Sequence, residues 1–358
     1  MKVGFVVRKG NFEVSPSLIG RGGYSVQRLT SILYERLLKN ADKDILINKV
    51  VMGTGGSTTV QRATMIGDLL YRDLNKYDIL HANAPLPLKP LRIGRNTKLV
   101  ETSHGIRSVD KEKACYCVEP KSRNIYEGFV NKIVERHVLS LDYIIAVSSL
   151  TKKRLIDLGF KGRIFVVNNG LDERFFKPLL PRKQKKRHFT VGYLGPFYFS
   201  KNVIFAINAF KKIEDKDMRF EIWGRQAFEY PRLLNAARSD KRIKFMGMAP
   251  ENQLINVYDS FDAFVYPTLC DQFPGSIVEA EARGLPVVTY NGGEMSSESR
   301  KYTLVAKDEE HMATILENLK TNGYSSRSRQ QSMSYARSFT ADRQAIEILN
   351  VYKKIHGE

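Results

Sequence analysis

Short apolar runs alternate with amphipathic segments along the first half of the chain. The runs are rich in β-branched residues, which is typical of strands that are buried on both faces. Segments with apolar residues at helical spacing lie between most of them, as in Tyr24–Leu38. The alternation predicts a parallel, doubly wound sheet. The predicted strands are Lys2–Val7, Ile45–Val51, Tyr77–His81, Lys98–Thr102, Tyr143–Val147 and Ile164–Val167.

The second half repeats the scheme, so we expect a second sheet of the same kind. Two such domains facing each other would form a central cleft, and ligands of such sheets bind outside the carboxyl ends of the strands. The predicted strands are Phe189–Leu194, Arg219–Trp223, Ile243–Met246, Ala263–Tyr266 and Val287–Tyr290. The predicted helices are Asn202–Ile213, Pro231–Ala237, Glu251–Tyr258, Ser276–Arg283, Glu309–Leu319 and Ala341–Ile355.

Two prolines and a run of basic residues separate the halves and cannot extend either sheet. This stretch predicts a linker at residues 177–188. We therefore assign an N-terminal domain to residues 1–176 and a C-terminal domain to residues 189–340. The amphipathic segment 341–358 is predicted to be a helix that packs back toward the N-terminal domain.

The composition agrees with two soluble α/β domains. The chain has 358 residues, of which 42% are hydrophobic, enough for two cores. It has no apolar stretch of about 18 residues, and the apolar run at its start is too short for a signal peptide. We therefore expect a cytoplasmic protein. The three cysteines, Cys115, Cys117 and Cys270, cannot form a disulfide framework, so we expect reduced thiols.

The charge of the chain is distributed unevenly. The net charge is +19, and residues 1–187 hold 35 Lys and Arg against 17 Asp and Glu. A basic field of this kind attracts anionic lipids, phosphorylated substrates or nucleic acids. A solvated basic surface that aids solubility explains it equally well. No nucleic-acid motif supports specific nucleic-acid binding.

The segment between the predicted strand Ala263–Tyr266 and the next helix contains the strongest candidate chemistry. The free N–H groups at the start of that helix suit an anionic phosphate. A carboxylate one turn inside the helix suits a ribose diol, and a carboxylate in the loop suits sugar hydroxyls. Alternatively, the loop carboxylate caps the helix and the helix carboxylate faces solvent. The residues are Asp271 in the loop, Gly275, Ser276 and Ile277 at the helix start, and Glu279.

The stretch from Arg242 to Glu294 resembles the C-terminal domain of the retaining glycosyltransferases of family 4, which have the GT-B fold. The family has two glutamates separated by seven residues, and the chain keeps this spacing with Asp271 as the first. Similar motifs continue through nearly the whole chain in the family's order. The matching pieces include Ile243-Lys-Phe-Met-Gly247, Asp262-Ala-Phe-Val-Tyr-Pro267, Glu279-Ala-Glu-Ala-Arg-Gly-Leu-Pro-Val-Val288, Ala146-Val-Ser-Ser149 and Thr102-Ser-His-Gly105.

The resemblance implies a role for individual residues. Glu279 would bind the ribose of a nucleotide, Asp271 would meet the donor sugar, and Lys201 would bind the donor diphosphate. The first loop and a base-binding loop would complete the donor site, and a histidine would position the donor sugar or the acceptor. Gly22 and Gly23 would lie in the first loop, Ala249 in the base-binding loop, and the histidine would be His104. His81 also matches a family position, but a structural role explains it equally well.

The chain departs from the family pattern in three places. Pro196 stands where the family has an arginine, and Asn202 replaces the glycine that follows the lysine. One phosphate-binding cation is therefore missing, and Arg225 is the candidate to replace it. Asp271 is one methylene shorter than the family's glutamate, which affects the predicted contact with the sugar.

The resemblance implies a retaining hexosyltransferase that uses a UDP- or GDP-sugar and needs no metal or other cofactor. The basic N-terminal half predicts an anionic, phosphorylated or lipid-linked acceptor and peripheral contact with the inner face of the membrane. A sugar-nucleotide-binding or glycan-binding relative that has lost catalysis is the alternative, motivated by the missing arginine. A nucleic-acid binder is a remote alternative, motivated by the net charge alone.

Overall fold

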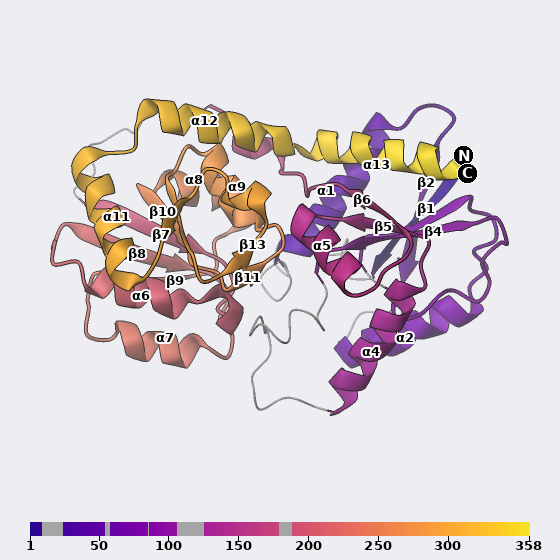
Figure 1. Cartoon of the computed structure of the whole chain (residues 1–358), viewed down its shortest axis with the longest axis horizontal. Coiled ribbons are helices and arrows are strands. Elements are labelled where there is room, and N and C mark those ends of the chain that lie inside the picture. The colour runs from indigo at the N-terminus through magenta and orange to yellow at the C-terminus, as the bar shows by residue number, and fades with distance from the viewer. Residues whose placement is uncertain (9–23, 54–57, 85, 106–124, 179–187) are drawn as a thin grey trace. The chain divides into compact units, whose positions relative to one another are not determined.

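The computed structural model describes residues 1–8, 24–53, 58–84, 86–105, 125–178 and 188–358 (Figure 1). The chain divides into two compact units of Rossmann-like architecture. Unit 1 contains the described residues of 1–109 and 123–172, together with residues 340–358. Unit 2 contains the described residues of 173–339.

Unit 1 is built on a sheet of six parallel strands in the order β2-β1-β3-β4-β5-β6. Only the edge strands expose much of their surface, because helices cover both faces of the sheet. The strands are β1 (Lys2–Arg8), β2 (Leu46–Met52), β3 (Ile79–Ala82), β4 (Lys98–Ser103), β5 (Tyr143–Ala146) and β6 (Arg163–Val166).

Side chains alternate between two cores along β1. Phe5 and Val7 point into a core that α1 and α13 cover, whereas Val6 points into a core covered by α2, α4 and α5. Figure 1 shows α13, at the C-terminal end of the chain, lying beside α1. The helices are α1 (Tyr24–Asn40), α2 (Thr58–Tyr71), α4 (Ile125–Leu139), α5 (Ser149–Asp157) and α13 (Ala341–His356).

Unit 2 has a parallel sheet in the order β14-β12-β10-β7-β8-β9. This is the strand order of the dinucleotide-binding fold, in which the order of the parallel strands reverses between the first strand and the fourth. A separate pair of short parallel strands, β11 and β13, lies in the loops. The strands are β7 (Phe189–Leu194), β8 (Met218–Trp223), β9 (Ile243–Gly247), β10 (Ala263–Tyr266), β11 (Cys270–Asp271), β12 (Val287–Tyr290), β13 (Glu294–Met295) and β14 (Leu304–Ala306).

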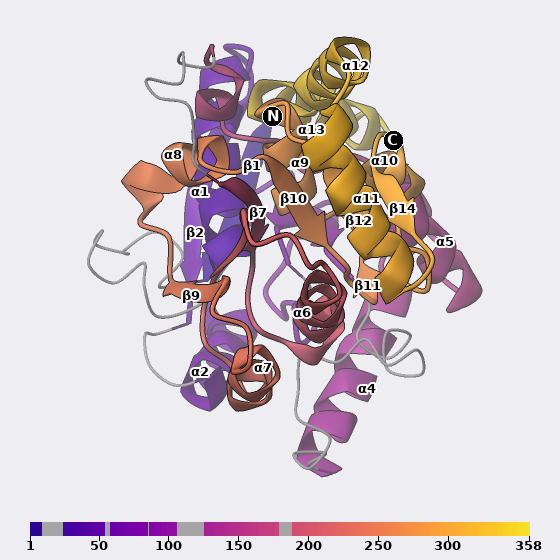
Figure 2. The same cartoon turned by 90° about the vertical axis from the view of Figure 1, so that its left-hand side faces the viewer.

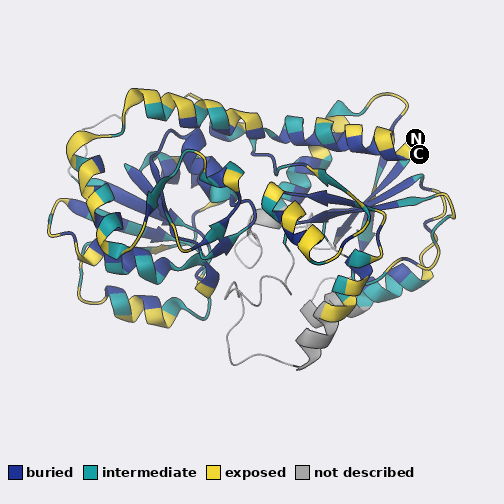
Figure 3. Cartoon of the chain, in the orientation of Figure 1, coloured by how far each residue is buried: buried dark blue, intermediate teal, exposed yellow. Residues whose placement is uncertain are grey.

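Helices cover both faces of this sheet as well. α6 and α11 pack together, as Figure 2 shows, and α9 packs against α12. The inner strands of the sheet are largely buried, whereas exposed residues lie on the outer sides of the helices and on the edge strand β9 (Figure 3). The α-helices are α6 (Val203–Lys211), α7 (Tyr230–Ala237), α8 (Leu254–Asp259), α9 (Gly275–Ala282), α10 (Ser297–Arg300), α11 (Glu309–Asn322) and α12 (Ser326–Ala336). The 3₁₀ turns are η3 (Glu173–Phe176), η4 (Phe199–Lys201), η5 (Glu251–Gln253) and η6 (Arg337–Phe339).

Two parallel α/β domains were the expectation from the sequence, and the structure confirms them. Cys270 is a buried free thiol, whereas Cys115 and Cys117 lie outside the described residues. None of the helices in the described part of the chain is long and apolar enough to cross a membrane.

Gly192 lies in β7, where a side chain has no room. A Cβ atom built on it would come within 2.2 Å of the Phe261 ring, which is itself fully buried. We therefore expect Gly192→Ala to lower the free energy of unfolding by about 1–3 kcal/mol, because an overpacked core must shift. Urea unfolding of the purified variant measures this loss.

Gly67 in α2 provides the matched control. A Cβ atom there would meet nothing within 4 Å. Gly67→Ala should raise the free energy of unfolding by roughly 0.5–1 kcal/mol, because alanine loses less backbone entropy in a helix. Equal effects of the two substitutions would contradict the packing described for β7.

Candidate functional site

The candidate site of unit 2 lies at the carboxyl ends of β7 and β10. These two strands are neighbours, and the connections that follow them lead toward opposite edges of the sheet. Open α/β sheets bind their ligands at such a reversal point. The loop after β7 ends at η4, and the loop after β10 contains β11 and leads into α9.

Backbone contacts hold these two loops together. The amide of Leu269 donates to the carbonyl of Ser200 at 2.8 Å, and the Thr268 hydroxyl donates to the same carbonyl at 3.0 Å. Lys201 follows Ser200 directly, and Asp271 lies two residues after Leu269. The backbone therefore sets both charged residues side by side.

Lys201 and Asp271 form an ion pair. The Nζ of Lys201 lies 2.5 Å from Oδ2 of Asp271, and both side chains are largely buried, with 14% and 18% exposed. The Tyr266 hydroxyl donates to the same carboxylate oxygen at 3.0 Å, and Nζ lies 5.6 Å from the centre of the Tyr266 ring. The charged ammonium and the charged carboxylate are therefore held together in a largely buried position.

Asn202 explains one departure from the family pattern. It is the one non-glycine residue of the described chain with a positive φ, at 51°, and it sits between η4 and α6. This left-handed conformation costs most residues about 1–2 kcal/mol, whereas glycine and asparagine adopt it more easily. Asn202 therefore occupies a backbone conformation that a glycine at this position would also adopt readily.

Helix α9 presents its N-terminus at the same edge. It begins at Gly275 after Pro274, whose side chain makes no capping hydrogen bond. Gly275 and Ser276 are partly exposed there. The expectation of three free N–H groups needs a correction, because the amide of Ile277 donates to the carbonyl of Pro274 at 3.2 Å. The first turn is tightened, and the candidate amides for an anion are reduced to those of Gly275 and Ser276.

Glu279 lies one turn inside α9 and is buried, with 5% exposed. The Tyr258 hydroxyl donates to its Oε2 at 2.7 Å. The alternative in which Glu279 faces solvent is therefore wrong. α9 ends as expected, with Gly284 after it at a φ of 69°. Asp271 belongs to β11 and does not cap α9, so the capping alternative is wrong too.

Two further predicted donor residues lie in the loops after neighbouring strands. Arg225 follows β8, and its guanidinium donates to the hydroxyl of Tyr198 and lies 5.6 Å from the centre of that ring. Tyr198 belongs to the loop that carries Lys201, and Pro196 begins the same loop. Arg225 is therefore placed beside the loop in which the family's arginine is missing. Ala249 is 7% exposed in the loop after β9.

The predicted residues of unit 1 divide into two groups. Gly22 and Gly23 lie outside the described residues. His104 follows β4 and is half-buried, and its Nε2 donates to the carbonyl of Asn83 at 3.1 Å. Burial lowers the pKa of His104 to about 4, although the hydrogen bond to Asn83 acts in the opposite direction. The ring is therefore neutral at pH 7, with Nδ1 as its acceptor atom.

His81 has a structural place. It is fully buried, and its ring nitrogens lie 2.5 Å from the hydroxyl of Tyr352 and 2.8 Å from that of Thr102. Burial lowers its pKa to about 3, and His104 lowers it further. His81 thus joins β3 to β4 and α13 within unit 1, and its two ring nitrogens are already engaged.

Asp-x-Asp sequences can bind a metal ion, and the chain contains two of them, which the expectation of a metal-free site did not take into account. Asp42-Lys43-Asp44 precedes β2, and Asp215-Lys216-Asp217 precedes β8. Both therefore lie at the amino ends of strands, and within unit 2 the Asp215 motif is at the end of the sheet opposite the edge that carries Lys201 and Asp271. Asp42 pairs with Lys353, and Asp215 pairs with Lys320.

Two family models match the chain, and together they cover more than two thirds of it. One, described as Glycosyltransferase Family 4, matches residues 54–175 in unit 1. The other, described as Glycosyl transferases group 1, matches residues 188–322 in unit 2. The chain is a glycosyltransferase of family 4. The resemblance and the enzyme class expected from the sequence are thereby confirmed.

Curated relatives of this glycosyltransferase are distant. The Phosphatidylinositol N-acetylglucosaminyltransferase GPI3 subunit of Saccharomyces cerevisiae is 23% identical over 201 residues, which cover 53% of this chain and 43% of the yeast protein. The chain therefore matches less than half of the length of that relative. The D-inositol 3-phosphate glycosyltransferase of Corynebacterium glutamicum is 24% identical over 345 residues, covering 87% of this chain and 78% of the relative.

Solved structures share the fold of this glycosyltransferase. Sucrose-phosphate synthase from Thermosynechococcus elongatus superimposes with a TM-score of 0.76 at 15% identity, covering 99% of both chains. Anabaena Alr3699/HepE, solved in complex with UDP and glucose, gives 0.66 at 16% identity and covers 99% of this chain and 100% of its own. The GT-B fold expected from the sequence is thereby confirmed.

Two tyrosines of the site were missed from the sequence. Tyr258 contacts Glu279, and Tyr266 contacts Asp271. Each lies at or near the end of an apolar element, where the sequence pattern predicts only that an aromatic residue packs in the core. The usable signal was the hydroxyl, since a buried tyrosine needs a hydrogen-bond partner.

The two histidines of unit 1 predict a stability that depends on pH. Their pKa values, about 3 for His81 and about 4 for His104, lie below the ordinary histidine value of 6.5. Below pH 6.5 the unfolded chain therefore binds protons that the folded chain does not. Stability should be full above pH 6.5 and fall toward pH 4, by about 1.4 kcal/mol per pH unit for each histidine.

Urea unfolding of the wild type and of His104→Gln between pH 7.5 and pH 4.5 measures this slope. We expect the variant to lose one histidine's share of it. His356→Gln is the control, because this histidine is exposed on the last turn of α13. Parallel curves for the wild type and His104→Gln would show that burial does not hold His104 neutral.

Proposed function

We propose that this glycosyltransferase moves a hexose from a UDP-sugar to a phosphorylated acceptor, with retention of the anomeric configuration. The observation that carries the donor side is the cluster at the carboxyl ends of β7 and β10. There Lys201 is paired with Asp271, and the loop after Asp271 leads directly into the N-terminus of α9. A cation and a helix N-terminus suit a diphosphate, and the inward carboxylate of Glu279 suits a ribose.

Each donor residue has a proposed role. The N–H groups of Gly275 and Ser276 and the ammonium of Lys201 bind the diphosphate. Glu279 accepts hydrogen bonds from the ribose hydroxyls. Asp271 accepts hydrogen bonds from the hexose, and its pairing with Lys201 keeps the shorter carboxylate in place. Alr3699/HepE, which shares the fold, was solved with UDP and glucose, and this supports the choice of UDP.

The proposed reaction breaks the bond between the anomeric carbon and the diphosphate oxygen. The acceptor oxygen forms its bond to that carbon from the same face, and its proton passes to the departing diphosphate. Negative charge grows on the diphosphate as the bond breaks. Lys201 and the α9 amides, already fixed in the fold, stabilise that charge without reorganisation.

We propose that no metal takes part. The support is positional, because Lys201 and the helix N-terminus already supply positive potential where the leaving group would lie. Arg225 is proposed to supply the positive charge of the family's arginine, whose position Pro196 occupies. Its guanidinium is held against Tyr198 in the lysine's own loop.

The proposed acceptor carries a phosphate and several hydroxyls. The names of two relatives refer to acceptors of this chemistry, phosphatidylinositol and D-inositol 3-phosphate. His104 of unit 1 supports the hydroxyl part, since its neutral ring offers Nδ1 as an acceptor. The excess of basic residues in the first half supports the phosphate part.

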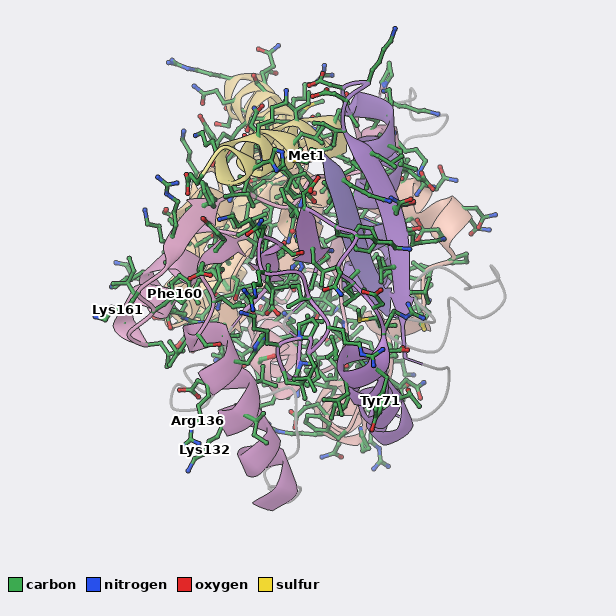
Figure 4. All side chains as sticks on the ribbon, turned by 90° about the vertical axis from the view of Figure 1, so that its right-hand side faces the viewer. Met1, Tyr71, Lys132, Arg136, Phe160 and Lys161 are labelled. Atoms are coloured by element: carbon green, nitrogen blue, oxygen red, sulfur yellow. The ribbon has the colours of Figure 1, made fainter. Side chains whose placement is uncertain are left out.

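We also propose that the protein is cytoplasmic and contacts the inner face of the membrane through α4 and α5. These helices cover the same face of the sheet, and each exposes two cations beside an isoleucine. Lys132 and Arg136 project from one side of α4 in Figure 4. Ile133 is 39% exposed and Ile156 is 54% exposed. Basic side chains around exposed apolar ones favour an anionic lipid surface.

Turnover of a UDP-hexose tests the donor site. We expect Lys201→Ala to lower kcat by about 10²–10³-fold, as for the loss of one preorganised charge-stabilising group. Glu279→Ala should lower kcat/KM roughly 10–100-fold, as for a lost hydrogen bond to a charged group. The measurement is the release of UDP in the presence of an inositol phosphate and a chelator, with a GDP-hexose assayed in parallel.

Lys211→Ala is the control for Lys201→Ala, because Lys211 is exposed at the end of α6 in the same unit. It should retain wild-type kcat. Unchanged turnover in Lys201→Ala would refute the donor site. Tight UDP binding by a wild type that turns over neither donor would favour the non-catalytic alternative.

Flotation with vesicles tests the membrane contact. The double variant Lys132→Glu/Arg136→Glu should lose binding to vesicles of phosphatidylcholine and phosphatidylglycerol by tenfold or more, since each cation contributes about 1 kcal/mol near such a surface. Lys241→Glu/Lys244→Glu changes the charge equally on exposed residues of unit 2 and should bind like the wild type. Equal losses would show that net charge, not the α4–α5 face, determines binding.

A further inference from the structure

A tyrosine outside the predicted site touches the ribose-binding carboxylate. Tyr258 belongs to α8 and is fully buried, and its hydroxyl lies 2.7 Å from Oε2 of Glu279. The same hydroxyl lies 3.5 Å from the carbonyl of Ser276, one turn earlier in α9. The carboxylate can only accept here, so Tyr258 donates.

The ring of Tyr258 is fixed by other aromatic rings. Phe175 and Phe261 meet it edge-on, with centroids at 5.8 Å and 6.3 Å, and Phe264 lies at 5.6 Å. Phe175, Phe261 and Phe264 are buried themselves. Because the ring is packed in this way, the hydroxyl oxygen is fixed within 2.7 Å of the Glu279 carboxylate, its shorter contact.

A second link holds α8 against α9. The residue after Tyr258, Asp259, accepts two hydrogen bonds from Arg283, at 2.7 Å and 2.8 Å. Arg283 follows the last residue of α9. The two helices are therefore joined one turn apart, at Glu279 and at Arg283. This second link should keep α8 against α9 when the hydroxyl of Tyr258 is removed.

We infer that Tyr258 is a positioning residue for the nucleotide, one that holds the Glu279 carboxylate in the orientation in which it accepts the ribose hydroxyls. The inference rests on the proposed role of Glu279. An isolated glutamate would have to fix its side-chain torsions when the ribose binds. The hydrogen bond from Tyr258 fixes them in the free protein, so the entropy cost of ordering the side chain does not weaken the binding of the nucleotide.

Tyr258→Phe removes the hydroxyl and keeps the ring. It leaves the aromatic packing and the Asp259–Arg283 link in place. We expect the Kd for UDP to rise about tenfold, the effect of one hydrogen bond to a charged group. KM for the UDP-hexose should rise by a similar factor while kcat stays close to the wild-type value, because the ribose is bound equally in the ground and transition states.

The decisive comparison uses UDP and 2′,3′-dideoxy-UDP, which lacks the two hydroxyls. Calorimetry gives the Kd of each ligand for the wild type and for Tyr258→Phe. A positioning role predicts that the substitution weakens UDP and barely affects the dideoxy ligand. Because both ligands are measured on one protein, a general loss of stability affects both and cannot imitate a selective loss.

Tyr335→Phe is the control, since Tyr335 is another tyrosine of unit 2 and its hydroxyl donates to the carbonyl of Glu298 at 3.0 Å. It should bind both ligands as the wild type does. Equal weakening of UDP and dideoxy-UDP by Tyr258→Phe, or no weakening, overturns the role of Tyr258 alone. A wild type that does not distinguish the two ligands overturns the ribose role of Glu279, and the inference fails with it.

Discussion

The burial of helix α9 from Ile277 onward is the constraint from which the proposed donor site follows. Every residue from Ile277 to Ala282 is buried, so the N-terminal turn is where the helix reaches the surface. Two glutamates inside the helix then need an explanation. Glu279 has the hydroxyl of Tyr258 as a partner. Burial instead raises the pKa of Glu281 to about 8, so that carboxyl is largely neutral at pH 7.

The same segment anchors the ends of unit 2. Arg283 donates to the carbonyls of Phe175 and Lys177, next to the point where the chain enters unit 2. Phe273 packs edge-on against Phe339, the last residue before the chain leaves it, with centroids at 5.2 Å. The residues between Asp271 and Arg283 thus include most of the proposed donor site and also anchor both ends of the unit.

The sequence predicts most of the fold because buried parallel strands leave a strong signal. Runs such as Ala263–Tyr266 are apolar throughout, and their bounds agree with the structure. The two-residue strand β11 leaves no such periodicity. Helix α12 was missed because its serines and arginines show no apolar stripe, and its buried residues are only Ser332 and Ala336.

The candidate site was predictable in its residue types and less so in its contacts. The spacing of Asp271 and Glu279 pointed to a loop and a helix, and the structure has that arrangement. The ion pair between Lys201 and Asp271 joins residues 70 positions apart, and no local pattern predicts it. The amide of Ile277 is lost to Pro274 because the first turn of α9 is tighter than a regular helix.

Hydrogen–deuterium exchange with and without UDP tests the central claim most directly, because it reports which backbone amides a ligand protects. The account predicts protection at the start of α9, in Gly275 and Ser276, and in the loop that ends at Lys201. The amide of Ile277, already bonded within the turn, should change less. Protection confined to other parts of unit 2, with these two loops unchanged, would contradict the account.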